Sequence, residues 1–218
     1  MCETCCVRSE LILASQSPRR QALLTVLGLT FTVDAADVDE TPRPAEPPTE
    51  LVGRLGRLKA LAVAARHPRA VVLAADTVVV LDGALLGKPA DADEAWAMLR
   101  ALRGRTHQVY TAVTVTNAGV ARSQLSISDV TMRPYSDAEI AGYVASGDPL
   151  DKAGAYAIQH PLFAPVAGWM GCYTGIMGLP LGGAADLLRA AGVLVPGDVA
   201  TACETIGGRC CLRGFAGS

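Results

Sequence analysis

Apolar residues recur with two different periods in this sequence, one typical of strands and one typical of helices. Continuous or alternating apolar runs predict strands, which we expect at residues 11–13, 31–33, 71–81, 108–116 and 121–132. Apolar residues at helical spacing predict helices, which we expect at residues 18–27, 49–67, 137–146 and 180–191, and from a cap at Asp91 or Asp93 to about residue 102. This mixture indicates the α/β class, as one domain or as two lobes around one cleft.

Local signals predict where several of these elements begin and end. Ser17 and Thr49 each precede a helical pattern, and we expect their hydroxyl groups to accept from free amides at the helix start. Asp82-Gly83 predicts a tight hairpin turn, and Ser136 with Glu139 predicts a capping box. The apolar face expected on the helix at 49–67 consists of Leu51, Leu55, Leu58, Leu61 and Ala62.

Composition excludes some classes of function. The chain has 218 residues, half of them apolar, so it can bury a sizeable core. A net charge of −2 with 5% aromatic residues disfavours binding to a nucleic-acid polymer, which normally needs a basic face with stacking rings. No apolar run is long enough for a membrane span, and the N-terminus lacks an apolar signal region. We therefore expect no membrane contact and a cytoplasmic location.

The seven cysteines gather near the ends of the chain. Six lie in 1–9 and 196–218, which we interpret as cysteine-containing tails around a domain at 10–195, and only Cys172 lies in the body. The odd count and missing signal region disfavour a disulfide framework, and the spacing does not complete a zinc site. We expect free thiols or adventitious metal binding, and an irregular chain after the last helix.

Two arginines lie in the first turn of the first predicted helix. Arg19 and Arg20 follow Ser17, where free backbone amides and the helix dipole already favour anions. Guanidinium groups beside such amides are typical of a phosphate site. Two solvated arginines on a surface helix are the alternative, and this turn by itself does not decide between them.

Acidic residues interrupt two stretches of different character. Asp76 lies within the apolar run 71–81, where a carboxylate is costly to bury unless it is paired, hydrogen-bonded or bound to a metal. The alternative is two short strands with Asp76 in the turn between them. Asp37, Asp39 and Glu40 lie in a proline-rich segment that could coordinate a hard cation or simply be well solvated.

Lysine is rare, with three lysines against sixteen arginines. Lys59, Lys88 and Lys152 are therefore candidates for sites that need a compact ammonium group rather than a planar guanidinium. Lys152 precedes the small residues 153–155, which would allow the backbone to approach a ligand closely or to form a tightly packed turn.

Eight segments together resemble one known family. Over about residues 10–193, they occur in the order and spacing of the Maf family of nucleoside triphosphate pyrophosphatases, and all three lysines fall within them. The segments are ASQSPRRQALL, VDE, RLKA, AADTVV, GKP, TH-Q-VYTAVTV, DKAGAYAIQ and GLPL.

The resemblance implies a fold and an activity. The fold would be related to the inosine triphosphate pyrophosphatases, with a long mixed sheet flanked by helices and two lobes around a deep cleft. The activity would be hydrolysis of a nucleoside triphosphate to the monophosphate and pyrophosphate, as a house-cleaning reaction that uses a divalent cation, Mg²⁺ or Mn²⁺. Family members are commonly dimers, so a homodimer is expected.

The resemblance also implies a catalytic set. Asp76 would be the proton acceptor, and Glu40 or Asp76 would hold the metal. Lys59 and Lys88 would neutralise charge on the triphosphate, together with Arg20. Ser15 and the amides at the helix start would complete the phosphate cradle.

The base recognised is a finer question. DKAGAYAIQ resembles the subgroup that acts on dTTP and UTP, in which Arg19, Thr77 and Gln159 would be the specificity residues. Asp151 and Lys152 of the same segment would also bind substrate. The alternatives are a 7-methyl-GTP pyrophosphatase of the same family, a nucleotide-binding regulator of septum formation, and a non-specific phosphatase. Trp169 either belongs to the core or borders the nucleotide.

Overall fold

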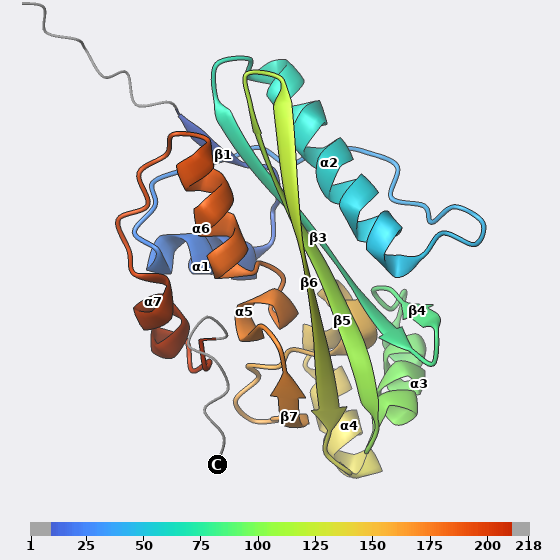
Figure 1. The fold of residues 1–218 in the computed structure, drawn as a ribbon. Coiled ribbons are helices and arrows are strands. Elements are labelled where there is room, and N and C mark those ends of the chain that lie inside the picture. Colours follow the sequence, from blue (N-terminus) through green and yellow to red (C-terminus); the bar gives the residue numbers. More distant parts are fainter. Residues whose placement is uncertain (1–9, 211–218) are drawn as a thin grey trace, which may run out of the picture.

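A mixed seven-stranded sheet runs through the centre of the protein in the computed structural model, which describes residues 10–210 (Figure 1). The strands are β1 (Leu11–Leu13), β2 (Thr32–Val33), β3 (Val71–Leu81), β4 (Ala84–Leu86), β5 (Thr106–Asn117), β6 (Val120–Met132) and β7 (Val166–Met170). Their order is β2-β1-β3-β5-β6-β7, and β4 pairs with β3 off this path. β1 is parallel to β2 and β3, and the other pairs are antiparallel.

Helices flank this sheet on both faces (Figure 1). They are α1 (Pro18–Val26), α2 (Pro48–Arg66), α3 (Ala92–Leu102), α4 (Asp137–Ala145), α5 (Tyr173–Ile176), α6 (Leu181–Ala190) and α7 (Val199–Thr205). Within residues 10–210, no helix has both the length and the apolar character needed to cross a membrane. The predicted α/β fold, with a long mixed sheet flanked by helices, is confirmed.

The two faces of β3 pack against different helices, as the alternation of side chains along a strand requires. Val72 and Ala74 belong to a core cluster with Ala60 of α2. Leu73 and Ala75 belong to the cluster that α1, α6 and α7 cover. Consecutive side chains of β3 after Ala75 therefore also point to opposite faces of the sheet.

One edge of β3 has a gap in its pairing. On that edge β1 pairs with residues 71–73 and β4 with residues 79–81, whereas β5 pairs along the other edge from 72 to 80 without interruption. Residues 74–78 therefore have a strand neighbour on one side only, and Asp76 is the central residue of the gap. The prediction of one continuous strand is confirmed, and the alternative of two short strands is wrong.

Turns and caps largely follow the predictions, with three corrections. The side chain of Ser17 caps nothing; Ser15 Oγ instead accepts from the Ser17 amide at 3.2 Å. α2 begins at Pro48 rather than after Thr49. Proline suits the first helical position, because the amide hydrogen that it lacks would have no partner within the helix there. Leu58 is 39% exposed, so it does not belong to the buried face of α2.

The sequence analysis predicted an irregular chain after α6. That prediction is wrong, because the segment contains α7. The Asp198 side chain accepts from the Thr201 amide at 2.9 Å, and Val199, Ala202 and Cys203 join the core cluster of α1 and α6. A helix of seven residues is too short to be stable alone, so its existence depends on this packing. The prediction missed it because that dependence leaves little local signal.

Cysteines of the described residues lie inside the protein. Cys172 and Cys210 are buried, and Cys172 Sγ accepts from the Gly175 amide at the start of α5 at 3.3 Å. Cys2, Cys5, Cys6 and Cys211 lie outside the described residues. Between residues 10 and 210, no group of three histidine, cysteine or acidic side chains could hold a metal ion.

Candidate active site

A pocket of about 1070 Å³ lies at the gap along the edge of β3. Its walls come from the end of β1, the start of α1, the segment 35–42, the end of β4 and the segment 151–159. All eleven predicted site residues line it: Ser15, Arg19, Arg20, Glu40, Lys59, Asp76, Thr77, Lys88, Asp151, Lys152 and Gln159. The fold therefore brings together residues that are up to 144 positions apart in the chain (159 minus 15).

Lys59 joins two carboxylates in this pocket. Its Nζ lies 2.7 Å from Asp76 Oδ1 and 2.8 Å from Glu40 Oε2. The Asp76 side chain is only 8% exposed, and burial raises its pKa above 3.8 although Lys59 opposes the shift. The group of three carries one positive and two negative charges, so it favours a further cation.

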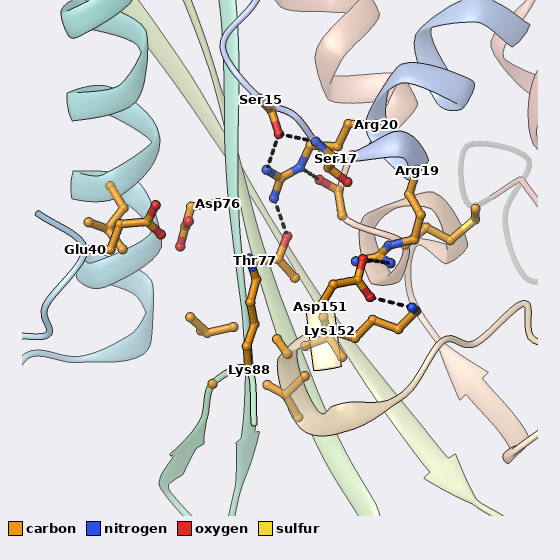
Figure 2. A pocket seen from close by; sticks show the side chains of 18 of the residues that line it. Ser15, Ser17, Arg19, Arg20, Glu40, Asp76, Thr77, Lys88, Asp151 and Lys152 are labelled. Carbon is orange, nitrogen blue, oxygen red and sulfur yellow. Dashed lines mark hydrogen bonds and ion pairs between the residues drawn. The ribbon is translucent and has the colours of Figure 1, made fainter. Parts of the chain in front are cut away.

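Arg20 is fixed by three neutral acceptors on the other side of β3 (Figure 2). It donates to the Gly178 carbonyl at 2.9 Å, to Ser15 Oγ at 3.1 Å and to Thr77 Oγ1 at 3.3 Å. Burial lowers the pKa of Arg20 below the usual value of a guanidinium, although the charge of Asp76 opposes the shift. Because no carboxylate of residues 10–210 is hydrogen-bonded to this guanidinium, its positive charge is available to an anion in the pocket.

Asp76 and Thr77 are neighbours in β3, but they serve different layers. Asp76 faces Lys59 of α2, whereas Thr77 faces Arg20 of α1 (Figure 2). Thr111 of β5 supports Thr77, since its Oγ1 donates to the Gly175 carbonyl at 2.8 Å and lies 3.0 Å from Thr77 Oγ1. The alternation of a single strand thus supplies both an acidic and a neutral polar group to one pocket.

Lys152 is largely satisfied by its own surroundings. Its Nζ donates to the Asp148 carbonyl at 2.5 Å, to Asp148 Oδ1 at 2.9 Å and to Asp151 Oδ1 at 2.6 Å. Asp151 also accepts from Arg19 Nη1 at 3.4 Å, which links this segment to the start of α1 (Figure 2). Burial alone would raise the pKa of Asp148, but hydrogen bonds from Tyr143 and Lys152 outweigh it and lower that pKa.

Two predicted residues keep unused polar capacity. Gln159 Oε1 is buried but makes no hydrogen bond within the described part of the chain. Lys88 is exposed beyond the end of β4, and its side chain extends into the pocket (Figure 2). An acceptor and a cation in the same pocket are therefore open to a bound molecule.

Sequence reasoning missed several contributors. Besides Thr111, the Gly178 carbonyl fixes Arg20, and Tyr156 lines the pocket while its hydroxyl lies 2.7 Å from His107 Nε2. Burial lowers the pKa of His107 to about 4, so this ring is neutral at neutral pH. Thr111 and His107 could have been found in the same way as Asp76, because each is a polar residue within a largely apolar strand. Trp169 packs against the core cluster and does not line the pocket.

The residues present fit a divalent cation. The carboxylates of Glu40 and Asp76 converge, because both contact the same Lys59 ammonium group, at 2.8 and 2.7 Å. Mg²⁺ is typically bound by one or two carboxylates together with phosphate oxygens and waters. Two convergent carboxylates with net negative charge therefore suit a metal that arrives with a phosphate ligand.

A sequence model described as Maf-like protein matches residues 10–191 of the chain. The chain belongs to the Maf-like family. A dTTP/UTP pyrophosphatase of Myxococcus xanthus is 54% identical over 187 residues, which are 85% of this chain and 94% of that protein. A second Maf relative, the dTTP/UTP pyrophosphatase of Thermomicrobium roseum, is 51% identical over 84% of both chains. A solved HAM1 protein from Coxiella burnetii is 17% identical, with a TM-score of 0.45 over 84% of this chain and 97% of that one.

Proposed function

We propose that this Maf-like protein hydrolyses dTTP and UTP to the monophosphate and pyrophosphate. The observation that carries the proposal is the buried Asp76 carboxylate, paired with Lys59 in a pocket where Arg20 offers an uncompensated positive charge. The names of relatives at 54% and 51% identity support the choice of substrate. Residues 10–195 would form the catalytic domain, in a cytoplasmic homodimer.

Asp76 would accept a proton from the attacking water. Its raised pKa makes it a stronger base than an exposed aspartate, and Lys59 holds one of its oxygens in place. A divalent cation, Mg²⁺ or Mn²⁺, held by Glu40 and Asp76 would supply charge neutralisation on the phosphate oxygens. Arg20 and Lys88 would stabilise the charge that develops on the departing pyrophosphate.

The helix start of α1 would hold the phosphates. Ser15 Oγ already accepts from the Ser17 amide and from Arg20, so these donors are oriented before a ligand enters. Free amides at a helix start with an ordered guanidinium beside them suit a phosphate group. Preorganised donors of this kind contribute most when charge develops in the transition state.

The base would be read by Arg19, Thr77 and Gln159. The unpaired Gln159 Oε1 needs a hydrogen-bond donor, which the N3–H group of uracil or thymine can supply. A base without a donor at that place would leave the oxygen unsatisfied, at a cost of about 1–3 kcal/mol. Asp151 and Lys152 would shape this part of the pocket by fixing Arg19 and the segment that leads to Gln159.

The deciding experiment is pyrophosphate release from UTP, dTTP, CTP, GTP and 7-methyl-GTP with Mg²⁺. We expect release from UTP and dTTP by the wild type, release about 10²- to 10⁴-fold slower by Asp76→Asn, and wild-type release by Asp186→Asn, an exposed aspartate of α6 outside the pocket. Activity on 7-methyl-GTP alone would contradict the base assignment, and orthophosphate as the product would contradict the reaction. Nucleotide binding with no release from any substrate would favour the regulator of septum formation instead.

A further inference from the structure

Glu40 keeps its place without any regular secondary structure around it. Residues 34–43 form neither helix nor strand, yet the Glu40 carboxylate meets Lys59 Nζ at 2.8 Å. Ordering the backbone costs conformational entropy, so a segment without a hydrogen-bond ladder needs other contacts to hold one conformation. Those contacts should be found next to Glu40.

Arg54 of α2 makes such contacts on the C-terminal side of Glu40. Its Nε and Nη2 donate to the two carboxylate oxygens of Glu46 at 2.6 and 2.7 Å, and Nη2 also donates to the Thr41 carbonyl at 3.1 Å. The Arg54 and Glu46 side chains are 16% and 5% exposed, so water competes little for this two-bonded contact. Arg54 therefore fixes the residue that directly follows Glu40.

The same short segment is closed by further hydrogen bonds. The Thr41 amide donates to Asp39 Oδ1 at 2.9 Å, and the Arg43 amide donates to Glu46 Oε2 at 3.0 Å. The hydrogen bonds from Arg54 hold the pKa of Glu46 at about 2, so this acceptor stays ionised at neutral pH. Both peptide groups of Thr41 are thus tied, one to Asp39 and one to Arg54.

The Arg54–Glu46 pair lies outside the wall of the pocket. Neither Arg54 nor Glu46 lines the pocket, whereas Glu40 and Lys59 do. Arg54 and Lys59 lie on one rigid helix, five residues and about 7.5 Å of helix rise apart. The helix that presents Lys59 to Glu40 therefore also holds the backbone on which Glu40 is carried.

We propose that Arg54, together with Glu46, is a positioning residue that sets Glu40 against Lys59 for the reaction. The inference rests on the proposed function, since it assigns Glu40 to the reacting site. The two-pronged geometry matters more than the charge, because Nε and Nη2 bind the two Glu46 oxygens side by side while Nη2 also reaches the Thr41 carbonyl, and a single ammonium nitrogen does not reproduce this planar fork.

The test is Arg54→Lys, which keeps the charge and removes the fork. We expect kcat for UTP to fall about 10- to 100-fold with KM changed less than about threefold, because misplacing a reacting group by about 1 Å costs rate on that scale. Arg103→Lys is the matched control, since Arg103 likewise donates to a carboxylate, Asp137 at 2.7 Å, and a carbonyl, Tyr135 at 3.2 Å, outside the pocket. Its kcat should equal that of the wild type.

A double mutant distinguishes positioning from general damage. If Arg54 acts through Glu40, then Arg54→Lys should lower kcat no further in a Glu40→Gln background. Independent losses that multiply, or an equal loss of kcat in Arg103→Lys, would overturn the inference. Glu46→Gln should reproduce the effect of Arg54→Lys more weakly, and thermal unfolding checks that each variant is folded.

Amide hydrogen exchange tests the contact without using activity. Peptides that cover residues 34–47 should exchange faster in Arg54→Lys than in the wild type or Arg103→Lys. Unchanged exchange would overturn the inference even if the enzyme is active. A wild type without pyrophosphate release would instead contradict the proposed function, while the exchange result would still decide whether Arg54 orders this segment.

Discussion

Lys59 and Lys152 are both buried lysines of the same pocket, at 9% and 6% exposure, but their partners differ. Lys59 contacts Glu40, which is 56% exposed, and Asp76, whose side chain is only 8% exposed. The carboxylates that contact Lys152, those of Asp148 and Asp151, are 35% and 59% exposed and thus reach water. Burial of the lysine alone therefore does not distinguish the two places; the buried carboxylate of Asp76, with its raised pKa, is what sets the surroundings of Lys59 apart.

The net charge around Lys59 also differs from the net charge around Lys152. Lys59 with Glu40 and Asp76 has net charge −1, whereas Arg19 and Lys152 with Asp148 and Asp151 sum to zero. A negative group carried by β3, α2 and the tethered segment 34–43 suits a cation and a reacting water. A neutral, internally paired loop suits the shaping of the pocket. Matched substitutions at the two places test this comparison.

The largest contrast is expected between Asp76→Asn and Asp148→Asn. Removing a proton acceptor should lower kcat for UTP about 10²- to 10⁴-fold. Asp148→Asn loosens the anchor of the loop and should act mainly on KM, by less than about tenfold. Steady-state kinetics of pyrophosphate release measures both constants. A similar fall in kcat for the two variants would remove the distinction between them.

The same comparison applies to stability through Lys59→Met and Lys152→Met. The first leaves the buried Asp76 without its counter-charge, and we expect the free energy of unfolding at neutral pH to fall by about 3 kcal/mol. The second leaves carboxylates that water can solvate, so a fall of about 1 kcal/mol is expected. Urea denaturation provides both values. A larger loss in Lys152→Met would show that the loop carries the more important buried charge.

The raised pKa of Asp76 predicts an acid limb above pH 3.8 in kcat/KM. The folded protein loses the ionised carboxylate as the pH falls through this raised pKa, and activity is lost with it. For stability the sign is opposite, because raising the pH through the same pKa costs the folded state more than the unfolded one. Both pH dependences should vanish in Asp76→Asn but persist in Asp148→Asn, as pH-rate and pH-denaturation profiles can determine.

The smallest effect is expected at the Arg19–Asp151 pair, whose side chains are 24% and 59% exposed. Asp151→Asn should change KM for UTP by less than about threefold, because solvent and salt screen such a pair. The difference from the wild type should shrink further in 0.5 M salt. A large loss that is independent of ionic strength would place Asp151 among the groups that bind substrate directly.

Much of the local structure was predictable from short-range signals. The capping box of Ser136 and Glu139 forms as expected, and Asp82-Gly83 makes the β3–β4 turn with both residues at positive φ. The role of Asp76 could be suspected because one acidic residue in an apolar strand is costly to bury unpaired. Those signals act over a few residues, so they survive without tertiary context.

Contacts between distant residues were not predictable in the same way. The existence of α7 depends on the core that α1 and α6 build, and the role of Arg54 depends on where the loop after β2 returns to α2. The surroundings of Lys88 and Lys152 could not be predicted either. The Lys88 side chain lines the pocket, whereas Lys152 is hydrogen-bonded within its own segment.

The sequence by itself determined most of the longer elements and the α/β class, because periodicity and caps are local properties, and its resemblance to the Maf family singled out the eleven candidate side chains. Only the tertiary structure decided that β1 and β4 leave residues 74–78 of β3 unpaired on one edge and that this gap becomes the pocket. It also decided which lysine faces a buried carboxylate. Burial and pairing depend on segments far apart in the chain, and the energies that set them exist only once those segments meet.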